Sequence, residues 1–366
     1  MRSGTKLWST IVDYFLILSA VIGVGFASGK EIYVFFFDFD AGSLIGLLSF
    51  GILYIYLFFI IDYIRKKCEL KSYSEFNNEI FGKLCKISEI VMLINFAITS
   101  AGMLAGADYL FQTFLGIGYK IPSIILSVIT FFILLGGINK IKFVANLIIP
   151  IMIAVIVVNS IKNINPENVN MAITAKNGAM AIYYGLLFGV NNFVAALPVL
   201  FETNLKSKGK IAVILSICLI ILLNILVFAS NNFVTDMPMF ELSKQVSKSF
   251  YYIYFATLLL GLFSTLMICS HNSKQIIAKD KKTIFVPLMI VLFNLILSNL
   301  GYAFIVKYLY VLSGIFSGIY VVSLIILIAI KLIKFNRQKN KNNEISSKSN
   351  EECCNSKENI DDKNSK

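Results

Sequence analysis

The chain has 366 residues, of which 57% are hydrophobic and 15% are charged, and its mean hydropathy is +0.77. Soluble domains carry about 25% charged residues, so this composition excludes an ordinary soluble enzyme, a secreted disulfide scaffold and a disordered chain. The formal net charge is +12. The basic residues lie in short connections between apolar runs, a pattern that is typical of membrane proteins and not of proteins that bind nucleic acid.

Apolar runs long enough for membrane helices follow one another along the chain. A helix that spans a bilayer needs about 20 apolar residues, and the first run is too long for a cleaved signal peptide. We therefore expect an all-α integral membrane protein with ten transmembrane helices. The runs are Ser9–Phe37, Ser43–Ile61, Ile87–Leu115, Ile121–Ile138, Phe143–Ile161, Gly178–Phe201, Ile211–Ala229, Phe250–Ser270, Ile284–Leu300 and Tyr308–Ile333.

The distribution of Lys and Arg predicts the orientation. The N-terminus and every second connection after it hold 20 of these residues, whereas the opposite connections hold 6. Because basic connections stay in the cytoplasm, we expect both termini there and the protein in a bacterial plasma membrane. We expect residues 1–334 to form a single ten-helix transporter domain. Residues 335–366 are polar, and we expect a disordered cytoplasmic tail.

Two of the runs contain residues that weaken a helix. The first has three glycines within residues 23–29, and each costs about 1 kcal/mol relative to alanine. The sixth has two glycines, two asparagines and a proline within residues 185–198. Interrupted helices at corresponding positions of two inverted halves indicate the binding site of a secondary transporter. We therefore expect inverted five-helix repeats at about 9–161 and 178–333, with helices 1 and 6 broken at mid-membrane. Alternatively, the glycines are notches for helix packing.

The first run also carries a recognisable motif. The segment Val21–Ile32 reads VIGVGFASGKEI and is followed by aromatic residues, and it resembles the first-helix signature of the YkvI-type bacterial membrane proteins. These belong to the amino acid–polyamine–organocation superfamily, which is similar to the sodium-coupled amino-acid transporters with a five-plus-five inverted-repeat fold. The superfamily-level likeness covers about residues 5–335. Lys30 departs from the pattern, where an uncharged residue such as glutamine is expected. The resemblance implies a fold and a class of function, but no particular substrate.

We expect the substrate to bind where helices 1 and 6 unwind. Backbone amides at the start of the outer half of helix 1 attract a carboxylate, and side chains of helices 3 and 6 face the same space. The alternative for the aromatic candidates is a packing role. The candidate substrate-binding residues are Gly23, Gly25, Phe26, Ala27, Ser28, Asn95, Thr99, Tyr184, Phe188 and Asn191.

A coupling-ion site follows from the resemblance. In the related sodium-coupled transporters, two hydroxyl residues of helix 8 bind sodium together with carbonyls of helix 1. This implies a sodium site formed by Ser264, Thr265 and the carbonyls of Ser19 and Ile22. Alternatively, the two hydroxyls bond back to their own helix. Residues 145–152 of helix 5 contain no lysine, which favours sodium over protons, although proton coupling stays open.

Ionisable residues within membrane spans are costly and usually functional. Asp13 lies in the inner part of helix 1, where we expect either an inner gate or a side chain that reaches water. Lys30 and Glu31 lie on the outer half of helix 1, and Asp108 lies on the outer half of helix 3. We expect an outer gate in which Lys30 pairs with Asp108 or Glu31. The alternative is a solvated rim.

These features together predict a secondary active transporter and not an enzyme. Its partners would be the lipid bilayer and a small amino acid or related amine-containing solute, with sodium as coupling ion and no other cofactor. A sensor or channel of the same fold is the alternative. A membrane enzyme is disfavoured, because the sequence has no Asp-rich metal motif and a single histidine, His271, which we expect in a loop. No nucleotide-binding loop is present, so an ion gradient would supply the energy.

Overall fold

The structure is a computed structural model. It describes Phe15, Leu18 and residues 27–37, 43–116, 120–136, 138–167, 178–201, 207–230, 235–278 and 284–361. Within these residues the regular secondary structure is helical throughout, as the sequence predicts.

The expected runs two to ten each coincide with a helix or a helical stretch. Most bounds differ from the apolar runs by a few residues, whereas α13 and α16 continue further into polar sequence. The elements are α3 (Lys30–Ile32), η1 (Tyr33–Phe37), α4 (Ser43–Lys67), α5 (Tyr73–Phe81), η2 (Gly82–Leu84), α6 (Cys85–Leu115), α7 (Ile121–Gly136), α8 (Ile138–Lys162), α10 (Gly178–Phe201), α11 (Ser207–Ser230), α12 (Pro238–Val246), α13 (Lys248–Ala278), α14 (Phe285–Ser298), α15 (Tyr302–Phe304), η3 (Ile305–Leu309) and α16 (Tyr310–Asp361).

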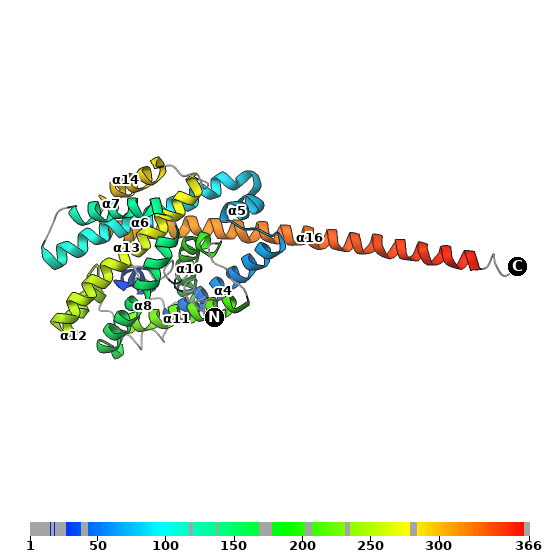
Figure 1. Cartoon of the computed structure of the whole chain (residues 1–366). Helices are drawn as coiled ribbons and strands as arrows, with labels where there is room; N and C mark the ends of the chain where they lie inside the picture. Colours follow the sequence, from blue (N-terminus) through cyan, green and yellow to red (C-terminus); the bar gives the residue numbers. More distant parts are fainter. Residues whose placement is uncertain are drawn as a thin grey trace, which may run out of the picture.

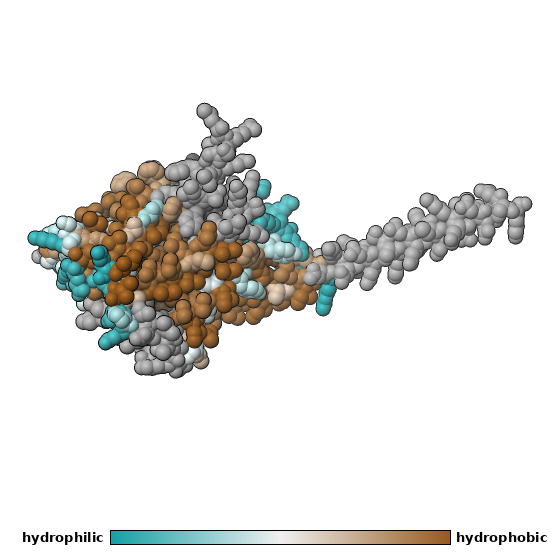
Figure 2. Space-filling model, turned by 90° about the horizontal axis from the view of Figure 1, so that it is seen from below, coloured by the Kyte–Doolittle hydropathy of each residue, from teal (hydrophilic) through white to brown (hydrophobic). Residues whose placement is uncertain are grey.

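Many of these helices have the length and composition of membrane spans. Among the described residues, five helical stretches are long and apolar enough to cross a bilayer, and further apolar helices are shorter. Figure 2 shows apolar residues over the middle of the molecule and hydrophilic residues at its two opposite ends. Such a belt is what the hydrocarbon core of a bilayer requires. The long stretches are Leu44–Lys67, Tyr73–Leu115, Gly178–Phe201, Lys248–Ala278 and Tyr302–Phe335.

The helices form one bundle, from which α16 extends (Figure 1). α4 packs along α10, and α6 packs along α13 and α16. The short amphipathic helices α12 and α5 lie at opposite ends of the bundle, which we call the α12 end and the α5 end. Residues 335–361, for which we expected no regular structure, continue α16 as a helix directed away from the bundle. They contain neither Gly nor Pro, so no residue there terminates the helix.

The predicted break in the sixth span is wrong. α10 is an uninterrupted helix from Gly178 to Phe201. Gly185 packs directly on the backbone of α4, where a Cβ atom would lie 2.1 Å from the carbonyl oxygen of Gly46. Gly189 similarly lies against Phe50. The glycines therefore serve as packing notches, and the packing that they permit outweighs their low helix propensity.

Candidate functional site

Helix 1 is interrupted inside the bundle, at the end of the glycine-rich segment. Ala27 is helical, Ser28 and Gly29 form a turn, and α3 begins at Lys30. Gly29 has a φ of 80°, in the left-handed region that glycine adopts most readily. The turn lies at the end of the segment in which we predict the break of helix 1; residues 19–26, where most of that break was expected, lie outside the described residues.

The backbone groups freed by this interruption are held by distant parts of the chain. The Tyr254 hydroxyl of α13 donates a 2.7 Å hydrogen bond to the carbonyl of Ala27. The backbone N–H of Met239, in α12, donates a 3.0 Å hydrogen bond to the carbonyl of Ser28. The Ser28 hydroxyl shares a 3.1 Å hydrogen bond with Tyr302. Three elements thus converge on the interruption, and its carbonyl groups point toward them.

A second polar cluster joins three helices in the interior. The side-chain amide of Asn95, in α6, donates to the amide oxygen of Asn191, in α10, over 2.6 Å. It also donates to the Ser317 hydroxyl, in α16, over 3.0 Å. The Ser313 hydroxyl donates to the same oxygen of Asn191 over 3.1 Å. The buried amide oxygen of Asn95 has no hydrogen-bond partner among the described residues.

The other predicted substrate residues have packing or local roles. The Thr99 hydroxyl donates to the carbonyl of Asn95, one turn earlier in α6. The Phe188 ring is buried and packs edge-on against Phe35 and Phe50, with centroid distances of 5.5 Å and 5.3 Å. Tyr184 is partly buried. For Phe188 the packing alternative is therefore the one observed.

The two helix-8 hydroxyls of the implied sodium site are buried in α13. Ser264 is 1% exposed and Thr265 is 6% exposed, and neither hydroxyl has a hydrogen-bond partner in the described part of the chain. By contrast, Thr257 on the same helix bonds back to the carbonyl of Ile253 over 2.8 Å. The alternative that Ser264 and Thr265 bond back to their own helix is therefore wrong.

The expected gate residues form different pairs. Lys30 lies 2.7 Å from a carboxylate oxygen of Asp236, just before α12. Asp108 pairs instead with Lys120 at 3.1 Å and accepts the backbone N–H of Ser123 over 3.0 Å. The predicted pairing of Lys30 with Asp108 or Glu31 is wrong, because a partner from the connection before α12 takes the Lys30 ammonium group.

A cavity opens at each end of the bundle. The cavity at the α12 end has a volume of about 470 Å³ and is bordered by both of these acidic residues, Asp108 and Asp236, and by Tyr302. Tyr302 therefore borders this cavity on one side and bonds to Ser28 of the turn on the other.

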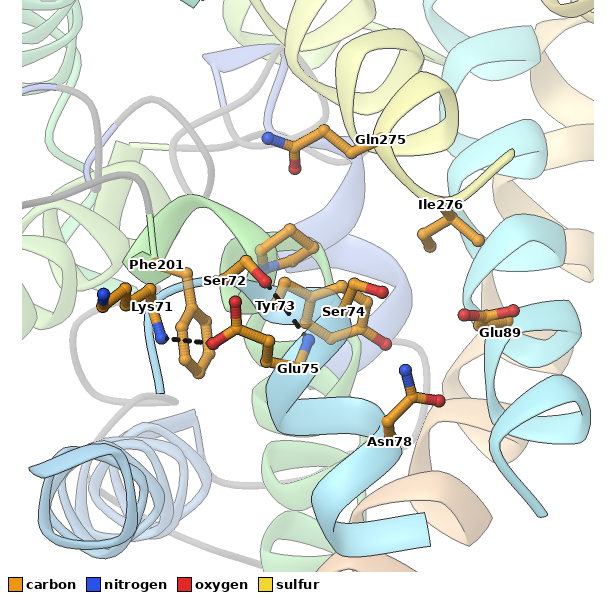
Figure 3. Close-up of a pocket in the computed structure, with 11 residues that line it drawn as sticks. Lys71, Ser72, Tyr73, Ser74, Glu75, Asn78, Glu89, Phe201, Gln275 and Ile276 are labelled. Atoms are coloured by element: carbon orange, nitrogen blue, oxygen red, sulfur yellow. Dashed lines mark hydrogen bonds between the residues drawn. The ribbon is translucent and has the colours of Figure 1, made fainter. Parts of the chain in front are cut away.

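The cavity at the α5 end has a volume of about 390 Å³. Figure 3 shows Glu75 and Asn78 of α5 together with Glu89 of α6 and Gln275 of α13 around it. Ser72 caps α5 by accepting the N–H of Glu75 over 3.2 Å. The cavity is therefore bordered by polar groups from α5, α6 and α13.

His271 does not lie in a loop as expected. α13 continues to Ala278, and His271 is a buried helical residue with 8% exposure. The polar residues Asn272 and Ser273 follow it inside the same helix, where Asn272 donates to the carbonyl of Ala195 over 3.0 Å. These interhelical and local hydrogen bonds allow the helix to continue beyond its apolar run.

Several predicted residues lie outside the described residues, and some residues that contact the site were missed. The missed residues are hydroxyl or acidic side chains that do not disturb a hydropathy pattern. Predicted residues outside the described part are Ser19, Ile22, Gly23, Gly25, Phe26 and Asp13. Residues that the sequence analysis missed are Asp236, Tyr254, Tyr302, Tyr310, Ser313 and Ser317.

The apolar helices and their polar interior are consistent with a multi-pass membrane protein. No family model matches the chain. It is similar to the uncharacterized membrane protein YkvI of Bacillus subtilis (strain 168), with 31% identity over 140 residues, 38% of this chain and 40% of the relative. It is also similar to the uncharacterized protein YyaD of the same organism, with 27% identity over 154 residues, 40% and 43% of the two chains. The matched region thus spans about two fifths of each relative.

Proposed function

We propose that this protein is a secondary active transporter of a small amino acid or related amine-containing solute. The observation that carries the proposal is the interruption at Ser28–Gly29, inside a bundle of apolar helices. Irregular backbone at membrane depth is tolerated where it is buried in protein or lines a cavity. Here it lies beside Tyr302, which borders the cavity at the α12 end.

Alternating access requires a path from each side toward a central site. The two cavities lie at opposite ends of the protein, and the cluster of Asn95, Asn191, Ser313 and Ser317 lies in its interior. We assign the α5 end to the cytoplasm, because the basic residues of the described segment 65–86 lie there. The proposal keeps the two inverted five-helix repeats, with a broken helix in the first repeat.

Sodium is the proposed coupling ion. Ser264 and Thr265 place two buried hydroxyl oxygens in α13 that have no partner among the described residues. A buried polar group without a hydrogen bond is costly, and hydroxyl oxygens suit a hard cation. A bound sodium ion would remove this cost, with backbone carbonyls of helix 1 as the remaining ligands.

Uptake by proteoliposomes tests the proposal. We expect saturable uptake of at least one member of a panel of amino acids, driven by an inward sodium gradient and showing counterflow. Thr265→Ala should abolish the sodium dependence, whereas Thr257→Ala is the matched control because Thr257 bonds to its own helix. If no member of the panel is transported or bound, the substrate class is wrong. Uptake that a proton gradient drives in the absence of sodium would show that protons are the coupling ion. Flux without counterflow would indicate a channel.

A further inference from the structure

Glu31 differs from the other acidic residues at the α12 end. Asp236 pairs with Lys30, Asp108 with Lys120, and Glu241 with Lys244, at N–O distances of 2.7, 3.1 and 2.6 Å. In the described part of the chain, no hydrogen bond or ion pair involves Glu31. Lys30 is adjacent in sequence, but consecutive helical side chains point about 100° apart. Because Lys30 bonds to Asp236, the Glu31 carboxylate has no counter-charge among the described residues.

The surroundings of Glu31 make that carboxylate costly. Glu31 is partly buried, and the next residue, Ile32, is 1% exposed. A carboxylate in such a place is expensive unless it is compensated by a cation or a proton. Because part of its surface is accessible, a small ion can reach it.

Two tyrosines pack on α6 next to the segment that carries Glu31, and the first of them contacts Ser28, three residues before Glu31. This first tyrosine is Tyr302, which bonds to Ser28 at the interruption of helix 1. The other is Tyr310, which is 2% exposed and whose hydroxyl has no hydrogen-bond partner among the described residues. Its oxygen faces Gly102, where a Cβ atom would lie 2.9 Å away. The absence of a side chain at Gly102 lets this hydroxyl approach the backbone of α6 closely.

The backbone brings these groups to one place. The π-helical segment Ile305–Leu309 separates the two tyrosines. In a regular α-helix, which turns about 100° per residue, the eight residues from Tyr302 to Tyr310 would leave the two side chains about 80° apart around the helix axis. A π-turn contains about one residue more per turn, and this largely removes the difference. Their rings accordingly contact Gly106 and Gly102, one turn apart on α6. A second π-helix, η1, begins two residues after Glu31. Such turns are frequent at functional sites.

We propose that Glu31, together with the hydroxyls of Tyr302 and Tyr310, binds the ammonium group of the transported solute. An ammonium group has three N–H donors and no acceptor, and the carboxylate and the two hydroxyls offer it three acceptors. The positive charge of the ammonium group compensates the Glu31 carboxylate. One of its N–H groups donates a hydrogen bond to the Tyr310 hydroxyl. The inference rests on the proposed transport function for its biological role, but the binding itself can be measured without transport.

Thermal unfolding of the full chain in detergent tests the site, with methylammonium chloride as the probe. Tetramethylammonium at the same ionic strength is the control ligand, since it has the same charge but no N–H donor. We expect methylammonium to raise Tm in a saturable way. Glu31→Gln should abolish this rise, and Tyr310→Phe should weaken apparent binding by about tenfold. Glu241→Gln is the matched control, because Glu241 is paired with Lys244 in α12.

The outcomes separate the possible sources of the effect. An unchanged response in both Glu31→Gln and Tyr310→Phe, no response of the wild type, or an equal response to tetramethylammonium would each overturn the proposal. A pH-dependent Tm that Glu31→Gln removes, without a methylammonium response, would show that Glu31 binds a proton and not an ammonium group. If methylammonium binds as expected but no amine is transported, the site stands and the transport function fails.

Discussion

The side-chain amide of Asn95 donates a 2.6 Å hydrogen bond to the amide oxygen of Asn191, and the two residues are 96 positions apart in the chain. This contact joins α6 to α10, and Ser313 and Ser317 add α16 to the same cluster. In the apolar interior of a membrane protein, such a network fixes how helices are placed relative to one another.

We expect Asn191→Leu to destabilise the protein by about 1–3 kcal/mol, because it leaves the amide of Asn95 and two serine hydroxyls without their shared acceptor. Unfolding in mixed detergent micelles would measure this change. Asn192→Leu is the matched control, since the Asn192 amide bonds to the Phe188 carbonyl of its own helix. Equal effects of the two substitutions would mean that the interhelical cluster contributes nothing specific.

Substitution of Gly29 tests the interruption of helix 1. Gly29 has a φ of 80°, so we expect Gly29→Ala to cost about 1–2 kcal/mol of stability. Gly318→Ala is the control, because this helical glycine has no atom near the added Cβ and alanine favours a helix by about 1 kcal/mol. The same unfolding assay compares them. Stabilisation by both substitutions would contradict a left-handed turn at Gly29.

The sequence predicted the helices well, because membrane spans depend on local composition. The bounds Gly178–Phe201 of α10 are those of the apolar run. The break predicted in this helix was wrong for a tertiary reason, since contact of Gly185 with the backbone of Gly46 outweighs the low helix propensity of glycine. Lone glycines can thus permit close packing as readily as they interrupt a helix.

Partners of the predicted site residues were harder to foresee. Asp236 lies in a connection, and nothing in its local sequence indicates a pairing with Lys30, 206 residues away. Ser313 and Ser317 are small polar residues in an apolar run, so they hardly change its hydropathy. Their spacing of four residues places them on one helix face, and this was the signal that could have identified them.

The packing notch at Gly185 gives a strong steric prediction. An added Cβ would lie 2.1 Å from the Gly46 oxygen, whereas at Gly189 the nearest atom would be 3.2 Å away, in the Phe50 side chain. We expect Gly185→Ala to destabilise by at least about 1–3 kcal/mol, since α4 and α10 must move apart. Gly189→Ala should cost less, because a side chain can adjust. Folded yield and Tm after purification would rank the two variants, and the reverse order would contradict this close approach.

The ion pair between Lys30 and Asp236 joins helix 1 to the segment that leads into α12. In the same region, the Met239 N–H bonds to Ser28, and the Asn159 side chain donates to the carbonyl of Met239 over 2.8 Å. We expect Asp236→Asn to loosen α12 without unfolding the bundle, because the remaining hydrogen bonds persist. Hydrogen exchange of Pro238–Val246 should therefore accelerate, by about fivefold for a loss of about 1 kcal/mol.

A charge swap shows whether the pairing itself matters. The double variant Lys30→Asp/Asp236→Lys should restore slow exchange in α12, whereas each single reversal should accelerate it by placing like charges together. Glu241→Gln is the control within α12, because it removes an exposed pair between residues three positions apart in the same helix and should leave exchange nearly unchanged. If the double variant exchanges as fast as the single reversals, the pair does not hold α12 against helix 1, and the backbone bond from Met239 to Ser28 must be what anchors that segment.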